Sequence, residues 1–242
     1  MKVKSLAMLL IIIMFISSTS LKGGVSNRIY ITEVIPGAAT TSFVLPSLAG
    51  GAVLSLAVSP FENKNKDYLY AHPFLPDAVS RTGDRYISEY WFIPISLIGV
   101  LAEGMKTDRY YEPLRYMVVA HTLNLGLTYG LKWAVRRERP NGMPLSFPSA
   151  HTSIAFTTAT LLTCLHGSLV GIPMYTMAVL TGLSRINDQM HWPSDVLFGA
   201  LLGTVTARAL YVSEQEEKES SSSIVMLPLI EIRFSSAQWI TK

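Results

Sequence analysis

Residues 147–195 read FPSAHTSIAFTTATLLTCLHGSLVGIPMYTMAVLTGLSRINDQMHWPSD, and this stretch decides the fold. It holds a long apolar run with one polar cluster before it and another after it. His166-Gly167 and Pro173 interrupt the run, and glycine and proline are the residues that punctuate helices. The pattern predicts two helices, over about residues 151–165 and 170–183.

Further apolar segments lie on both sides of this stretch. Residues 37–61 carry no charge and predict an apolar helix or a broken helical pair, whereas residues 62–89 are polar and loop-like. Additional helices are expected in the segments 90–102, 116–135 and 194–212. The sequence therefore predicts an all-α fold, a compact bundle of about five or six apolar helices.

The chain after this bundle has a different composition. Residues 214–223 are acidic and rich in serine, which is typical of a linker. Residues 224–242 alternate weakly between apolar and polar side chains, so short strands are an option for this tail. The predicted organisation is an N-terminal apolar segment and polar loop at 21–89, a catalytic helical core at 90–212, and a linker and tail at 213–242.

The composition excludes several classes of protein. Charged residues make up 15% of the 242 residues, against roughly 25% in an ordinary soluble domain. The hydrophobic share is 49% and the mean hydropathy is +0.32, which excludes disorder for most of the chain. Cys164 is the only cysteine, so a disulfide scaffold is excluded. A net charge of +3 argues against a nucleic-acid partner.

The low charge points to a protein that works at a membrane. Most apolar segments between charges are only about 12 to 17 residues long, whereas a bilayer crossing needs roughly 20. A compact bundle associated with the membrane and a bundle embedded in it both stay open.

The first residues resemble a secretory signal. Two lysines precede an apolar run at residues 6–16, and small polar residues follow at 17–20. This order is that of a signal peptide over residues 1–20, with an uncleaved anchor helix as the alternative. Either way, the N-terminus directs the chain to the cell envelope.

Three polar clusters interrupt the charge-poor part of the chain. The first motif is KWAVRRERP at residues 132–140. Lys132 and Arg139 lie two helical turns apart, so they share a face if the helix continues to Pro140. Two cations on one face could clamp an anion, or they could flank a membrane segment. Arg136 and Arg137 are interpreted as solvated helix surface, with tuning of the site or contact with substrate as the alternative.

The second motif is FPSAHT at residues 147–152. Proline and serine are typical of a helix start, where free backbone N–H groups attract anions. Ser149 and Ala150 would lie at that start, and His151 in the first turn could donate a proton to a leaving group. A capped helix with an incidental histidine explains this motif equally well when it is taken alone.

The third motif is SRINDQMHWPSD at residues 184–195. His191 and Asp195 are spaced four residues apart, which lets a carboxylate hold an imidazole N–H and leave the other ring nitrogen free to attack. Arg185 supplies a third cation. Asn187 and Asp188 are interpreted as solvated loop, again with tuning of the site or contact with substrate as the alternative.

Taken together, the motifs resemble the type 2 phosphatidic acid phosphatase family, which shares its site with the vanadium haloperoxidases. The resemblance covers residues 90–212, with Ala150 standing where the family usually has glycine. It implies that His191 attacks phosphorus, that Asp195 orients it and that His151 protonates the leaving group. It also implies that the phosphate is bound by five groups: Lys132, Arg139, Arg185, Ser149 and the backbone N–H of Ala150.

The resemblance implies a metal-independent phosphatase without a cofactor. Its substrate would be a phosphate monoester or pyrophosphate, most readily one linked to a lipid, at the inner membrane or on its periplasmic side. Soluble phosphate esters are the closer alternative. A vanadate-dependent haloperoxidase and a non-catalytic anion- or lipid-binding envelope protein are the others. His72, His121 and His166 are scattered and do not suggest a metal site.

Overall fold

The computed structural model describes residues 25–65, 72–88 and 92–237, so the predicted signal or anchor at residues 1–20 lies outside them. All regular structure in the described ranges is helical, which confirms the all-α prediction. The chain divides into two compact units. One comprises residues 40–209, and the other comprises residues 25–39 and 210–237.

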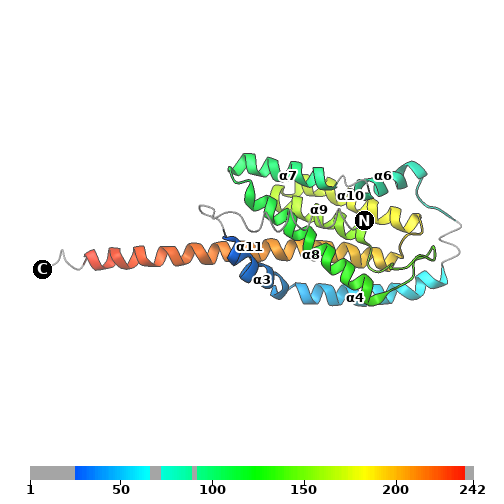
Figure 1. The fold of residues 1–242 in the computed structure, drawn as a ribbon, viewed down its shortest axis with the longest axis horizontal. Coiled ribbons are helices and arrows are strands. Elements are labelled where there is room, and N and C mark those ends of the chain that lie inside the picture. The colour runs from blue at the N-terminus through cyan, green and yellow to red at the C-terminus, as the bar shows by residue number, and fades with distance from the viewer. Residues whose placement is uncertain (1–24, 66–71, 89–91, 238–242) are drawn as a thin grey trace. The chain divides into compact units, whose positions relative to one another are not determined.

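The helices follow one another along the chain and are labelled in Figure 1. In order they are α2 (Asn27–Ile29), the π-helix η1 (Tyr30–Val34), α3 (Ile35–Thr40), α4 (Val44–Lys64), α6 (Asp77–Ser88), α7 (Phe92–Thr107), α8 (Tyr111–Val135), α9 (Ala150–His166), α10 (Ser168–Asn187) and α11 (Pro193–Ala237). The predicted segment 37–61 is therefore a broken helical pair, since a turn separates α3 from α4.

Helix α9 is the centre of the unit formed by residues 40–209. It packs against α7, α8 and α10, and its core residues are small or branched. Ile154, Ala155 and Ala159 meet Ala178 of α10 in one buried cluster. Small side chains let helices approach closely, which suits a bundle that has few charges.

Helix α11 crosses α9 at glycines. A Cβ on Gly199 would lie 2.7 Å from the carbonyl oxygen of Ser149, and a Cβ on Gly203 would lie 2.2 Å from that of Ser153. Only glycine allows backbones to come this close. The start of α9, which carries the second motif, is thereby held against the start of α11, which carries the end of the third.

Buried hydroxyl and amide groups add specific contacts between helices. Asn124 and Thr128 of α8 both bond the hydroxyl of Ser153 in α9, at 3.1 and 3.0 Å. Tyr116 of α8 donates to the carbonyl of Ala207 in α11, at 2.8 Å. Each buried polar group with a partner avoids the cost of being desolvated alone, so these bonds favour one packing over its alternatives.

The predicted loop over residues 62–89 is wrong in part. Helix α4 continues to Lys64, and residues 77–88 form α6. Gly83 lies against the backbone of α10, and Thr181 donates to the Gly83 carbonyl at 3.1 Å. Tertiary packing of one small-residue face stabilises this otherwise polar helix, which local composition does not reveal.

The expected strands in the tail are also wrong within the described residues. Helix α11 runs from Pro193 to Ala237, through the segment predicted to be a linker. Neither glycine nor proline occurs from Thr204 to Leu227 to end the helix. Glu214 and Lys218 form an ion pair of 3.1 Å one turn apart, which supports continued helix.

The smaller unit joins the first helices to the later part of α11. The hydroxyl of Ser213 donates to the carbonyl of Val34 at 2.9 Å. A Cβ on Gly37 would lie 2.5 Å from the same hydroxyl oxygen. Close backbone approach at a glycine is therefore repeated in this unit.

Three of the described helices are long and apolar enough to cross a membrane: Val44–Glu62, Ser168–Asn187 and Pro193–Ser220. Helix α4 exposes large apolar side chains, among them Leu45 and Leu56. Exposed apolar surface of this kind is stable in lipid and costly in water. The apolar segments looked too short to span because the helices continue into their polar flanks.

Candidate active site

The three motifs meet at one end of the unit formed by residues 40–209. The backbone N–H of Ser149, in the second motif, donates to the carbonyl of Asp195, in the third, at 3.0 Å. The ammonium group of Lys132, in the first motif, donates to the carbonyls of Leu145 and Ser146, at 2.6 and 3.0 Å. The segment just before the second motif is therefore tied to both other motifs.

The first motif is not one continuous helix. Helix α8 ends at Val135, and Arg136 takes the left-handed conformation with φ of +51°. The prediction that Lys132 and Arg139 share a helix face is therefore wrong. Arg139 lies in a turn in which its N–H donates to the carbonyl of Met143 at 2.7 Å. A left-handed residue at this position is a common way to end a helix.

The second motif starts α9 as predicted. Ser149 has extended backbone, and its hydroxyl accepts from the N–H of Thr152 at 3.5 Å and from the Thr152 hydroxyl at 2.9 Å. Ser149 is thus the N-cap of α9, with Ala150 as the first helical residue. His151 follows and lies within electrostatic range of Lys132 and Arg139.

The third motif places His191 in the loop between α10 and α11. Its side chain is 2% exposed, and its backbone N–H donates to the carbonyl of Arg185 at 3.1 Å. Nδ1 of His191 lies 3.7 Å from Oδ2 of Asp195, which is longer than a hydrogen bond. The predicted bond is therefore not formed, and among the described residues this Nδ1 has no other partner.

The carboxylate of Asp195 is fully buried and held from several directions. Oδ2 accepts from the backbone N–H of Trp192 at 3.0 Å and from the hydroxyl of Ser146. Oδ1 accepts from Arg137 at 2.8 Å. A carboxylate with this many donors is kept ionised and in one orientation, facing His191.

Burial lowers the pKa of His191 from its ordinary value of 6.5 to about 4. The charges of Lys132 and Arg139 lower this pKa further, whereas Asp195 raises it. The neutral imidazole is the form with a free lone pair. In this surrounding it persists well below neutral pH.

Two arginines each have a buried side-chain N–H donor that makes no hydrogen bond to another residue in the described ranges. These donors are Nε of Arg139 and Nε of Arg185. Another nitrogen of Arg185, Nη1, pairs with Asp84 of α6. Both guanidinium groups are at least partly buried, and a buried donor without an acceptor is costly. A bound anion such as phosphate would satisfy donors of this type.

Sequence reasoning missed three charged residues. Arg137 was interpreted as solvated, but its guanidinium binds Asp195 and also Glu62, at 2.9 Å. Glu62 lies at the end of α4, and Asp84 lies in α6. Glu62 is the first charge after the uncharged segment 37–61, which is the one signal in the sequence that sets it apart.

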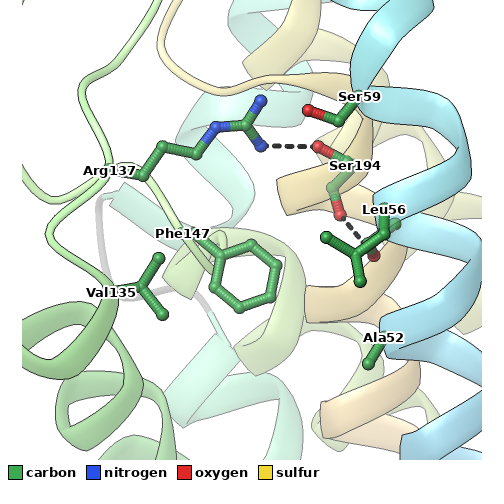
Figure 2. A pocket seen from close by; sticks show the side chains of 8 residues that line it. Ala52, Leu56, Ser59, Val135, Arg137, Phe147 and Ser194 are labelled. Carbon is green, nitrogen blue, oxygen red and sulfur yellow. Dashed lines mark hydrogen bonds between the residues drawn. The ribbon is translucent and has the colours of Figure 1, made fainter.

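A cavity of about 300 Å³ lies beside this network, with Arg137 on its wall. Figure 2 shows Arg137 pointing to Ser194, with Leu56 and Ala52 of α4 on the other side. The lining residues are Ala52, Ser55, Leu56, Ser59, Val135, Arg137, Phe147 and Ser194. None of them is a predicted site residue, although Val135, Arg137, Phe147 and Ser194 belong to the three motifs. The cavity therefore borders the predicted site residues rather than containing them.

Asn187 and Asp188 are not simply solvated loop, as predicted, but anchor another segment. The amide oxygen of Asn187 accepts from the backbone N–H groups of Phe74 and Leu75, both at 3.0 Å. Asp188 accepts from the hydroxyl of Ser80 at 2.7 Å. The third motif therefore holds the start of α6 in place.

The described residues contain no group of three or more His, Cys, Asp or Glu side chains that could bind a metal ion. The chemistry that the site itself offers consists of a buried neutral imidazole, a second histidine, a carboxylate and three cations. Such a set can stabilise an oxyanion and transfer a phosphoryl group.

The chain is similar to several curated lipid phosphatases. It is 39% identical over 103 residues to the lipid A 1-phosphatase of Porphyromonas gingivalis, and this match covers 39% of this chain and 23% of that protein. It is 32% identical over 124 residues to the decaprenylphosphoryl-5-phosphoribose phosphatase of Mycobacterium tuberculosis, a match that covers 47% of this chain and 65% of that protein. It is 28% identical over 123 residues to the lipid A 4'-phosphatase of Helicobacter pylori, a match that covers 46% of this chain and 60% of that protein.

The matched segments span less than two thirds of each of these relatives. The family model of the PAP2 superfamily matches residues 113–219, which contain all three motifs. The segment that carries the candidate site, residues 113–219, thus belongs to the PAP2 superfamily.

Proposed function

We propose that this protein is a phosphatase that hydrolyses a lipid-linked phosphate monoester or pyrophosphate at the cell envelope, without a metal, through a phosphohistidine on His191. The observation that carries the proposal is the buried neutral imidazole of His191 within electrostatic range of Arg139, whose buried Nε has no partner among the described residues. Arg185 adds a second buried Nε of this kind, and its backbone carbonyl accepts from the N–H of His191. Phosphoryl transfer spreads negative charge over the phosphate oxygens, and fixed cations stabilise that charge.

The reaction would proceed in two steps. A ring nitrogen of His191 attacks phosphorus, the bond to the leaving oxygen breaks, and His151 donates a proton to that oxygen. Burial and the charges of Arg139 and Lys132 lower the pKa of His151 to about 4 in the free protein, so the negative charge of the bound phosphate must raise this pKa for His151 to act as the acid. Water then attacks the phosphohistidine while His151 accepts its proton, which releases inorganic phosphate and restores the imidazole. Arg139, Arg185 and the backbone N–H groups at the start of α9 would bind the phosphate oxygens.

Lys132 contributes charge and also shapes the site. Its ammonium group already donates to two carbonyls, so at most one of its three N–H bonds is left for phosphate. We infer that it holds the loop before the second motif and adds positive potential at the phosphate. Ser149 similarly acts as the cap that orients the N–H groups of α9.

A lipid substrate is supported by the apolar helices around the site and by the lipid-linked substrates in the names of the similar proteins. The cations Lys106 and Arg109 lie at the end of α7 and just before the start of α8, at the end of α8 opposite to Lys132. By the positive-inside rule, these residues favour the cytoplasm, and the site would then face the periplasm.

The test is phosphate release by the purified protein from a panel of lipid and soluble phosphates, with a chelator present. We expect release from a lipid phosphate or diphosphate under these conditions. Right-side-out vesicles given a membrane-impermeant phosphate ester should release phosphate without detergent if the site is periplasmic. Release that requires added metal, or vanadate-dependent peroxidation alone, would contradict the proposed function.

The acid limb of kcat/KM should lie near pH 4 rather than near 6.5. The attacking imidazole must be neutral, and burial lowers the pKa of His191 to about 4, so the nucleophile is protonated only as the pH falls through that lower value. The measurement is a pH profile with two substrates whose phosphate groups ionise differently. A limb near 6.5 with both substrates would contradict a buried neutral nucleophile.

A further inference from the structure

A chain of three charged side chains lies behind the proposed nucleophile. Glu62, Arg137 and Asp195 come from α4, from the segment after α8 and from α11. Arg137 donates through one nitrogen to Asp195 at 2.8 Å and through the other to Glu62 at 2.9 Å. Glu62 and Asp195 are 1% and 0% exposed, so the two carboxylates depend on this guanidinium for charge compensation.

Glu62 also binds the start of α11 directly. Its carboxylate accepts from the backbone N–H of Ser194 and from the Ser194 hydroxyl, the latter at 2.9 Å. Ser194 is the second residue of α11, and Asp195 is the third. A carboxylate at a helix N-terminus satisfies donors that the helix itself leaves free. Glu62 therefore orients the backbone that carries Asp195, as well as the arginine that binds its side chain.

We propose that Glu62 and Arg137 form a positioning pair that fixes the carboxylate of Asp195 and preserves its negative charge toward His191. The proposal rests on the proposed phosphatase function. If Arg137 faced Asp195 alone, its charge would neutralise that carboxylate. Because Glu62 shares the guanidinium, these two carboxylates and one cation carry one net negative charge between them. That charge offsets part of the positive potential of Lys132 and Arg139 at His191 and stabilises the cation that forms there.

Neither residue of the pair is expected to touch phosphate. Arg137 has its donors on Glu62, Ser194 and Asp195, and its side chain also stacks on the Trp192 ring, 5.2 Å from the centroid. Loss of the pair should therefore slow the chemical step and leave substrate binding unchanged.

The test uses two conservative variants of the full-length protein. Glu62→Gln removes the charge but keeps the shape, and Arg137→Lys keeps the charge but cannot bridge two carboxylates. We expect each to lower kcat by about 10- to 100-fold with KM within about twofold, as for other groups that orient a reacting side chain. Arg136→Lys is the matched control, since Arg136 is the exposed neighbour, and it should behave as wild type.

A double-mutant cycle separates positioning from a merely structural role. If Arg137 acts through Asp195, Arg137→Lys should have little further effect on kcat in an Asp195→Asn chain. If Arg137→Lys lowered kcat by the same factor in the wild-type chain and in the Asp195→Asn chain, the proposal would be overturned. Wild-type kcat in both single variants would also overturn it, and so would loss of folding in both, seen by thermal unfolding, which would make the pair structural.

These outcomes differ from failure of the proposed function. If the wild-type protein releases no phosphate from any substrate of the panel, the phosphatase proposal fails. If wild type is active and His191→Ala is not, while the Glu62 and Arg137 variants behave as wild type, the positioning role alone fails.

Discussion

Replacing His191 by alanine should abolish phosphate release, with kcat reduced by about 10⁶-fold, the scale seen when a catalytic nucleophile is removed. The reason is that no other described side chain at the site combines a neutral, buried nucleophilic nitrogen with a carboxylate 3.7 Å away. His151 lacks such a carboxylate partner in the contacts that the structure gives it. The measurement is phosphate release together with rapid-quench trapping of the phosphoenzyme, which for phosphohistidine is labile in acid and stable in alkali.

His166→Gln is the matched control for this prediction. His166 lies at the opposite end of α9 from the motifs, where its ring contacts the carbonyl of Gly99 at 2.9 Å. This variant should form the phosphoenzyme and release phosphate as wild type does. A phosphoenzyme that persists in His191→Ala would show that another residue is the nucleophile.

Replacing Asp195 by asparagine should lower kcat on the order of 10⁴-fold, as for the carboxylate that orients a catalytic histidine elsewhere. Asp195 accepts from Arg137, Ser146 and Trp192, and an amide can offer only one acceptor oxygen in place of two. The variant loses the charge that stabilises His191 as it becomes cationic. The measurement is single-turnover kinetics, which isolates formation of the phosphohistidine.

Asp188→Asn is the control for the carboxylate. Asp188 lies in the same motif but accepts from Ser80 and anchors α6 rather than facing His191. We expect its kcat to stay within about fivefold of wild type, because an intramolecular hydrogen bond contributes only about 1 kcal/mol net. Equal losses in the two variants would mean that Asp195 acts through folding and not through the nucleophile.

The candidate site could be located from the sequence because its parts are local. Each motif falls at a helix end, and helix ends are marked by proline, serine and changes in charge. The apolar run between the second and third motifs predicts two helices, and two antiparallel helices bring their outer ends to the same side. Ser149 and Asp195 are indeed joined by a backbone hydrogen bond of 3.0 Å.

Side-chain partners could not be predicted in the same way. Arg137 and Glu62 are 75 positions apart, and Arg185 and Asp84 are 101 apart. No local pattern distinguishes an arginine that pairs with a distant carboxylate from one that faces water. Helix α8 ends just before Arg136 because this residue takes the left-handed conformation. The end of the helix sets the directions of the arginine side chains that follow in the first motif.

Similar reasons explain the errors in the fold. Helix α6 is polar in sequence and is stabilised by its contacts with α10. Gly83 packs against the backbone of α10, and Ser80 donates to Asp188 at the C-terminal end of α10. The segment predicted to be a linker is helical because neither glycine nor proline interrupts α11 between Thr204 and Leu227, whereas the weak alternation that follows favoured strands. Local propensity is a weak guide where tertiary contacts or helix continuation compete with it.

By itself, the sequence determined that the chain is helical and charge-poor, and that its remaining charges gather in three motifs at helix ends. Only the tertiary structure decided which charges act on one another. It moved Arg137 from the surface to the carboxylate of Asp195, brought Glu62 and Asp84 to the motifs, and tied Lys132 to backbone carbonyls. The physical reason is that periodicity records which faces are buried, whereas a buried charge is stable only beside a partner that the fold supplies.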